Sequence, residues 1–175
     1  MCVRGAAAKG VYYPPMTRGQ RIADSIERAV SGPVWHGPSL VDLIGDVGAV
    51  EAAERPVTGA HSIWELVLHM TAWAEIARQR LAAEPPPPPT DEDDWPLVRD
   101  QSAESWRAAV ERLKDSHREL AGEVSAMDDK RIVDRLAGRD HSALVMLHGV
   151  IEHDAYHGGQ VAILKRALSR PPNTT

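Results

Sequence analysis

Three histidines fall within ten positions near the C-terminus, in the segment HGVIEHDAYHGGQ at residues 148–160. His153 and His157 are four positions apart, so on an α-helix they lie about 40° apart around the axis and about 6 Å apart along it. Imidazoles in this arrangement can each give one nitrogen to the same metal ion. His148 lies five positions before His153 and points to another side of such a helix. The spacing therefore predicts a metal-binding pair that does not include His148.

Two histidines at this spacing also occur without a metal, partly buried in a helical bundle, so the chemistry depends on further ligands. Zinc peptidases of the HExxH type place a glutamate general base beside the first histidine. They also take a third ligand from further along the chain. Here Asp154 stands in the position of the glutamate, and GGQVAILKRALSRPPNTT after His157 contains no His, Glu, Asp or Cys. The sequence excludes a zinc-peptidase site of this type.

A third ligand must come from the chain before the pair. Five further histidines are available there: His36, His61, His69, His117 and His141. Metal sites in helical bundles are built from facing helices at similar depth. His69 is preferred because it lies inside a predicted helix, close to its apolar positions. His117 is the competing candidate, with a core histidine as the alternative interpretation, and His61 and His141 are expected at the ends of the bundle.

The elements that carry these histidines are predicted to be helices. Apolar residues recur at helical spacing, no useful length alternates with period two, and Phe is absent. Long helices are expected over residues 17–31, 62–83, 102–127 and 141–168, with shorter pieces near residues 39–46 and 50–54. Ser62 and Glu65 form a capping box at the start of the second long helix. We expect an all-α protein, a four-helix bundle with short accessory helices.

Five prolines at residues 85–89 separate the second and third long helices and are followed by TDEDDWP. Consecutive prolines cannot form a helix, so this stretch is predicted to be a crossover loop of polyproline type. The acidic residues are interpreted as a solvated loop. A cation site is the alternative, although the residues lack the spacing of a calcium-binding loop. We expect a single domain over residues 17–170, a disordered N-terminal lead over residues 1–16 and a C-terminal tail over residues 171–175.

Composition narrows the possible partners. The chain has 175 residues, enough for one compact domain, with 43% apolar and 26% charged residues and a net charge of −5. This charge argues against a generally basic surface for nucleic acids. Cys2 is the only cysteine, so an internal disulfide is excluded. Neither a membrane-spanning apolar run nor a signal peptide is recognisable. We expect a cytoplasmic protein that binds neither nucleic acid nor membrane.

Three segments together resemble the DinB/YfiT-like superfamily. They are WHGPSL at residues 35–40, GAHSIWELVLHMTAW at residues 59–73 and LHGVIEHDAYHGGQVAILKRAL at residues 147–168. The third is the most specific, because its histidine spacing, its tyrosine and the following Gly-Gln agree at once. The resemblance covers the chain from about residue 16 to residue 169.

This resemblance implies a four-helix bundle that holds a divalent metal with three histidines, one from the second long helix and two from the last. On this chain these are His69, His153 and His157. The resemblance further implies a homodimer. Members of the superfamily include S-transferases that use bacillithiol or mycothiol, mycothiol-dependent isomerases and proteins described as metal-dependent hydrolases. It therefore indicates the metal more firmly than the reaction.

Three neutral imidazoles would leave a coordination position open on the metal, as in catalytic zinc sites. A water bound there ionises near neutral pH, whereas a thiol binds as a nucleophilic thiolate. The expected function is thus a metal-dependent enzyme that activates a thiol for S-transfer or a water for hydrolysis. Imidazole suits several metals, with zinc and nickel as the first expectations. A small-molecule substrate and a low-molecular-weight thiol co-substrate are expected.

Two residues near the predicted ligands are catalytic candidates. Glu65 lies one turn before His69 and could orient it, or could serve only as the helix cap. Tyr156 precedes His157 and is otherwise interpreted as a packing residue with a satisfied hydroxyl. The alternative function is a non-catalytic bundle, a dimeric stress-response protein that binds a metal or a small molecule. Removal of one ligand histidine would abolish turnover in the first case, and would weaken only metal binding or stability in the second.

Overall fold

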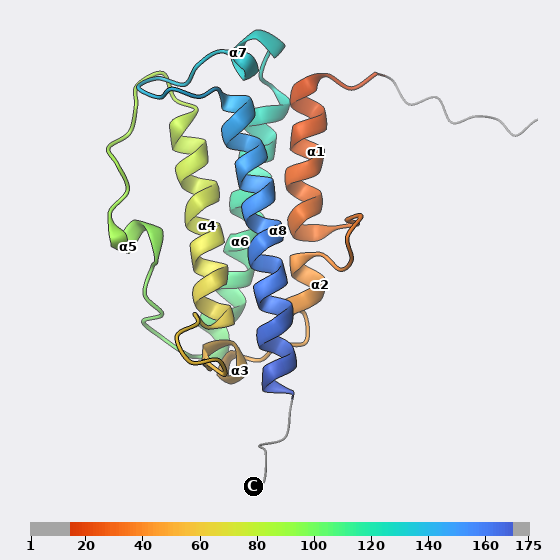
Figure 1. Ribbon diagram of the computed structural model, residues 1–175, viewed down its shortest axis with the longest axis vertical. Coiled ribbons are helices and arrows are strands. Elements are labelled where there is room, and N and C mark those ends of the chain that lie inside the picture. Colours follow the sequence, from red (N-terminus) through yellow and green to blue (C-terminus); the bar gives the residue numbers. More distant parts are fainter. Residues whose placement is uncertain (1–14, 170–175) are drawn as a thin grey trace, which may run out of the picture.

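The structure is a computed structural model that describes residues 15–169 (Figure 1). Helices and no strands occur in this range: α1 (Arg18–Ser31), α2 (Leu40–Ile44), α3 (Ala49–Ala53), α4 (Ile63–Arg80), α5 (Asp91–Asp94), α6 (Ala103–Ser125), α7 (Asp129–Val133) and α8 (Ala143–Leu168). The predicted all-α class is confirmed. Apart from residues 15 and 16, the expected lead and tail lie outside the described residues. Among the described helices, none is long and apolar enough to span a membrane.

The four long helices α1, α4, α6 and α8 form a bundle, as predicted. α1 packs against α6 and α8 on one side, and α4 packs against the same two helices on the other. Figure 1 shows α1 and α8 running in one direction and α4 and α6 in the opposite one. Because α4 and α6 are parallel, the chain between them must return along the whole bundle. Residues 81–102 make this return and carry α5 along the outer side of α4 (Figure 1).

Polar caps set the starts of the long helices. Thr17 and Gln20 form a capping box at α1, in which the Gln20 side chain accepts from the Thr17 amide at 2.9 Å. The predicted Ser62–Glu65 capping box is present at α4, where Glu65 accepts from the Ser62 amide at 2.7 Å. Such caps satisfy amides that have no partner inside the helix. The helix starts therefore agree closely with those expected from the sequence.

The acidic segment was predicted to be a solvated loop. Residues 91–93 are exposed, but the segment is not a loop. Its residues form the short helix α5, and Thr90 caps it by accepting from the Asp93 amide at 3.2 Å. Helix α7 follows Asp128 in a segment for which no helix was predicted. Helices of about one turn show no apolar periodicity, so only their caps could have indicated them.

Two apolar clusters fill the bundle, one toward each end. One contains Ile26, Leu120 and Leu147, and the other contains Met70 and Leu113, all fully buried. On α6 and α8 the two clusters are separated by a buried polar layer that includes His117, Asp154 and His157. Polar groups in such a position need partners, because their desolvation is costly. This layer lies at the depth where the predicted metal ligands meet.

The close approach of α1 to α6 gives a first prediction. A Cβ atom at Gly19 would lie 2.4 Å from the carbonyl oxygen of Val124, which is backbone and cannot turn aside. Gly19→Ala is therefore expected to lower the free energy of unfolding by about 1–3 kcal/mol. Gly122→Ala on α6 is the control, because nothing lies within 4 Å of its new Cβ. It should stabilise the protein by up to about 1 kcal/mol. Urea unfolding measures both, and equal effects would contradict the close approach.

Candidate metal centre

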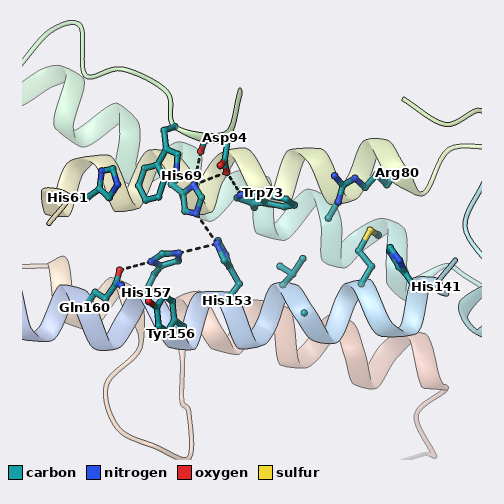
Figure 2. Close-up of a pocket in the computed structure, with 15 residues that line it drawn as sticks. His61, His69, Trp73, Arg80, Asp94, His141, His153, Tyr156, His157 and Gln160 are labelled. Carbon is teal, nitrogen blue, oxygen red and sulfur yellow. Dashed lines mark hydrogen bonds and ion pairs between the residues drawn. The ribbon is translucent and has the colours of Figure 1, made fainter. Parts of the chain in front are cut away.

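Three imidazole nitrogens converge between α4 and α8. Nε2 of His153 lies 2.9 Å from Nε2 of His69 and 3.0 Å from Nε2 of His157. The ligand atoms of all three residues lie within 4.8 Å of one another. His69 projects from α4 and the other two from one face of α8 (Figure 2). The structure thus brings together the three histidines that were expected as ligands.

In two of the three rings, the Nδ1 atom points away from the other rings and forms a hydrogen bond with an oxygen acceptor. Nδ1 of His69 donates to the carbonyl oxygen of Asp94 at 2.6 Å, and Nδ1 of His157 donates to Oε1 of Gln160 at 2.7 Å (Figure 2). The proton positions follow from these partners. With Nδ1 protonated, Nε2 of each neutral ring carries a free lone pair that faces the other rings. Outer hydrogen bonds of this kind fix the tautomer and orientation of metal-binding histidines.

Burial keeps the three rings neutral at neutral pH. Burial, followed by the neighbouring His157, lowers the pKa of His153 to about 4. Burial is also the main reason why the pKa values of His69 and His157 lie below their ordinary value. Neutral imidazole is the form that binds metal, so little proton competition is expected near pH 7.

The arrangement of these donors fits a divalent ion. Nitrogens on a tetrahedral zinc, with Zn–N bonds of about 2.0–2.1 Å, lie roughly 3.3 Å apart. The two short separations of 2.9 and 3.0 Å are close to this value. Three lone pairs at such distances repel one another unless a proton or a cation lies between them. The group can therefore hold a metal ion with at least one position left for another ligand.

A cavity of about 690 Å³ opens beside the three histidines. Its walls come from α4, α8 and the crossover segment, and Trp73 on α4 is one of them (Figure 2). The lining also includes Trp95, Met146 and Val150. This volume and the mostly apolar walls are typical of pockets for small molecules. The open metal position would thus face a space large enough for a substrate.

Two crossover residues complete the site, and the sequence had not indicated either. Trp95 stacks on His69, with ring centroids 3.8 Å apart and planes 7° apart, and it also stacks on His61 at 3.6 Å. Asp94 accepts from Nε1 of Trp73 through Oδ1 at 2.6 Å. The acidic segment therefore ends against the site, and His61, which was expected at the end of the bundle, lines the cavity. A tryptophan directly after the acidic run was the one available signal.

The two catalytic candidates, Glu65 and Tyr156, have different surroundings in the structure. Glu65 accepts from the Ser62 amide and from Nε of Arg55 at 3.0 Å, so it acts as the helix cap. Its carboxylate makes no described hydrogen bond to His69. Tyr156 is 65% exposed and lines the cavity, with its ring edge-on to His157 at a centroid distance of 5.0 Å. The packing interpretation of Tyr156 is therefore wrong, whereas a catalytic role for it stays a prediction.

The competing ligand His117 belongs to a separate buried pair. Its Nε2 lies 3.1 Å from Oδ2 of Asp154 and its Nδ1 lies 2.8 Å from the carbonyl oxygen of Leu113. Since both partners are acceptors, both ring nitrogens carry protons and the ring is an imidazolium ion. Burial opposes this charge, but the charge of Asp154 and these hydrogen bonds outweigh it and raise the pKa of His117. His117 is thus a partner of Asp154 and not a metal ligand.

The remaining histidines lie outside the three-nitrogen group. His36 and His148 are exposed, as expected for His148 from its position on the helix. His141 lines the cavity at the end away from the three histidines, near Arg80 (Figure 2). The cavity therefore has the candidate metal site toward one end and basic side chains toward the other.

Comparison with known protein families gives one match. The sequence profile of the DinB superfamily matches residues 36–161, which is well over half of the chain and includes His69, His153 and His157. Comparisons with curated proteins and with solved structures give no match. The helical bundle and the three-histidine group agree with the family match. This protein belongs to the DinB superfamily.

Proposed function

We propose that this protein is a metal-dependent enzyme in which His69, His153 and His157 hold a divalent ion, zinc or nickel, that activates a thiol or a water. The observation that carries the proposal is the convergence of three neutral imidazole nitrogens beside an open cavity of about 690 Å³. A structural zinc site would instead be closed by four protein ligands. When bound, the ion would lower the pKa of a thiol or water in its open position.

The protein residues around the ion hold and shield the reacting group. The Asp94 carbonyl and Gln160 fix the rings of His69 and His157 with their lone pairs inward. Trp95 covers the His69 ring on its face, and Trp73 forms a further wall held by its hydrogen bond to Asp94. These aromatic walls exclude water from one side of the site, which strengthens the electrostatic interactions inside it.

Thiol transfer is favoured over hydrolysis because a thiolate needs no general base, whereas a water would depend on His61, His141 or a single carboxylate in the cavity wall. Asp94 is the one carboxylate residue among the described residues that line the cavity, and its Oδ1 already accepts from Trp73. Attack by water is commonly assisted by a carboxylate or histidine base, whereas a thiolate is nucleophilic without one. In S-transfer the thiolate sulfur bonds to an electrophilic carbon, the leaving group departs with its electron pair, and the thiol proton passes to solvent.

The proposal is tested with zinc- or nickel-loaded protein, an aliphatic thiol and an activated aryl chloride, with chloride release as the readout. An activated phenyl ester in a parallel assay tests hydrolysis. Wild type should turn over one substrate pair, and His157→Ala should fall to the rate without protein. His148→Ala is the matched control on the same helix and should keep the wild-type rate, because His148 is exposed outside the group.

The alternative function is a non-catalytic bundle that binds a metal or a small molecule. It is supported if metal-loaded wild type turns over neither substrate although metal binding depends on His157. Homodimer formation stays a prediction. Measurement of the mass of the metal-loaded protein in solution, by light scattering, tests it separately.

A further inference from the structure

The end of the cavity away from the three histidines carries the Arg80 guanidinium, which pairs with no described carboxylate, whereas the neighbouring His141 contacts Asp140 at 3.2 Å. Arg80, in the last turn of α4, lines the cavity together with His141 (Figure 2). Within residues 15–169, no carboxylate lies at ion-pair distance from the Arg80 guanidinium. Its Nε is buried without a hydrogen-bond partner, as is that of Arg78. Arg80 is half-buried, and a partly desolvated guanidinium is normally paired. The missing carboxylate points to a ligand.

The absence of a described carboxylate partner for Arg80 is notable in an acidic chain, which has 25 Asp and Glu against 20 Lys and Arg. Arg78, two residues earlier on the same helix, pairs with Glu119 at 3.4 Å and with Glu123 at 3.2 Å. Burial, and next the nearby charge of Arg139, lower the pKa of Arg80, so a second cation adds to the positive potential at this end. Such a concentration of positive charge at a cavity wall attracts anions.

Arg80 lies within reach of a molecule bound at the candidate metal site. Its guanidinium carbon lies 5.2 Å from the Trp73 ring centroid, and that ring lies 5.9 Å from the His153 ring. The guanidinium is therefore no more than about 11 Å from the His153 ring. Between the two ends the cavity is walled by Trp73, Ala77, Met146 and Val150, which are apolar or aromatic. One elongated molecule can contact both ends.

We propose that Arg80 is a specificity-determining residue that binds the carboxylate of an elongated, apolar-centred organic acid whose other end lies at the three histidines. Guanidinium groups bind planar carboxylates with strong, charge-assisted hydrogen bonds. The apolar middle of the cavity accommodates an aliphatic or aromatic spacer. This inference rests on the proposed function only in placing the reacting group at the histidine end, whereas the carboxylate subsite stands by itself.

The first experiment uses metal-free protein, prepared with a chelator, and follows tryptophan fluorescence on addition of octanoate or its methyl ester. Octanoate should bind about tenfold or more tightly than the ester, because the ester cannot form the charged hydrogen bonds. This preference should disappear in Arg80→Gln and persist in Arg80→Lys. Arg78→Gln removes the same charge from the same helix outside the cavity and should keep the preference. Equal binding of acid and ester by wild type, or equal losses in Arg78→Gln and Arg80→Gln, would overturn the proposal.

The second experiment uses zinc-loaded protein and ω-mercaptoalkanoates of increasing chain length. Affinity should pass through a maximum at one length, because only that length lets the thiol and the carboxylate reach their two sites together. A maximum that is lost in Arg80→Gln supports the proposal, and a featureless increase with length contradicts it. If octanoate shows the Arg80-dependent preference but the thiol end contributes no affinity, thiol activation fails while the carboxylate subsite stands, and the ester assay then decides whether water activation remains.

Discussion

His153→Ala is expected to reduce bound zinc from about one equivalent per chain to none detectable. His153 is the central member of the three-histidine group, since its Nε2 lies 2.9 Å and 3.0 Å from those of the other two. Its removal leaves two imidazoles, fewer than the three protein ligands of catalytic zinc sites. Mass spectrometry of untagged protein, dialysed after incubation with zinc, measures the stoichiometry.

The control for this measurement is His148→Ala, which removes an exposed histidine from the same helix. It should retain one equivalent. Far-ultraviolet circular dichroism checks that both variants remain helical, so that loss of metal is not loss of fold. Full retention of zinc by folded His153→Ala would show that the three histidines are not the binding site. Wild type that stays empty in excess zinc would remove the main support for an enzyme.

The helices and the convergence of His69, His153 and His157 were predictable because their signals are local. The spacing of His153 and His157 requires only that the segment is helical. The choice of His69 required only that it lies mid-helix, and the resemblance to the DinB superfamily agreed with it. Capping residues such as Ser62 set the helix starts within about a residue. All of these features depend on residues a few positions apart.

The sequence did not indicate those residues whose roles depend on contacts between distant segments of the chain. Trp95 and Asp94 reach the site because the crossover segment lies along α4, and a stretch that follows five prolines has no periodicity to reveal this. The role of Arg80 depends on which carboxylates lie near it in space. Asp154 follows a ligand directly, yet it points about 100° further round the helix, toward α6 and His117. Its partner depends on how α6 is rotated.

The second prediction with a large effect concerns this buried pair. Asp154→Asn should lower the free energy of unfolding by about 3–5 kcal/mol, because the buried His117 imidazolium loses its counter-charge and must either stay charged without it or give up its proton. Both side chains are 1% exposed, so solvent cannot replace the lost partner. Asp115→Asn is the matched control on α6, since it breaks an exposed pair with Arg118 and should cost less than about 1 kcal/mol. Urea unfolding in the presence of a chelator compares the two variants.

The same pair should make stability depend on pH. The pKa of His117 is raised in the folded protein, so the folded state holds a proton that the unfolded chain releases above about pH 6.5. The resulting stabilisation is complete below that pH and is lost as the pH rises through the folded pKa, with a slope of up to about 1.4 kcal/mol per pH unit. The pKa values of the three site histidines are lowered, so their protonation changes the free energy of unfolding below about pH 6.5 and not in this window.

Asp154→Asn should reduce the fall of the unfolding free energy above about pH 6.5, because a neutral amide no longer favours the charged ring of His117. An unchanged slope in this variant would mean that His117 is neutral in the folded protein, and the cost of the substitution would then have to arise from the lost hydrogen bond alone.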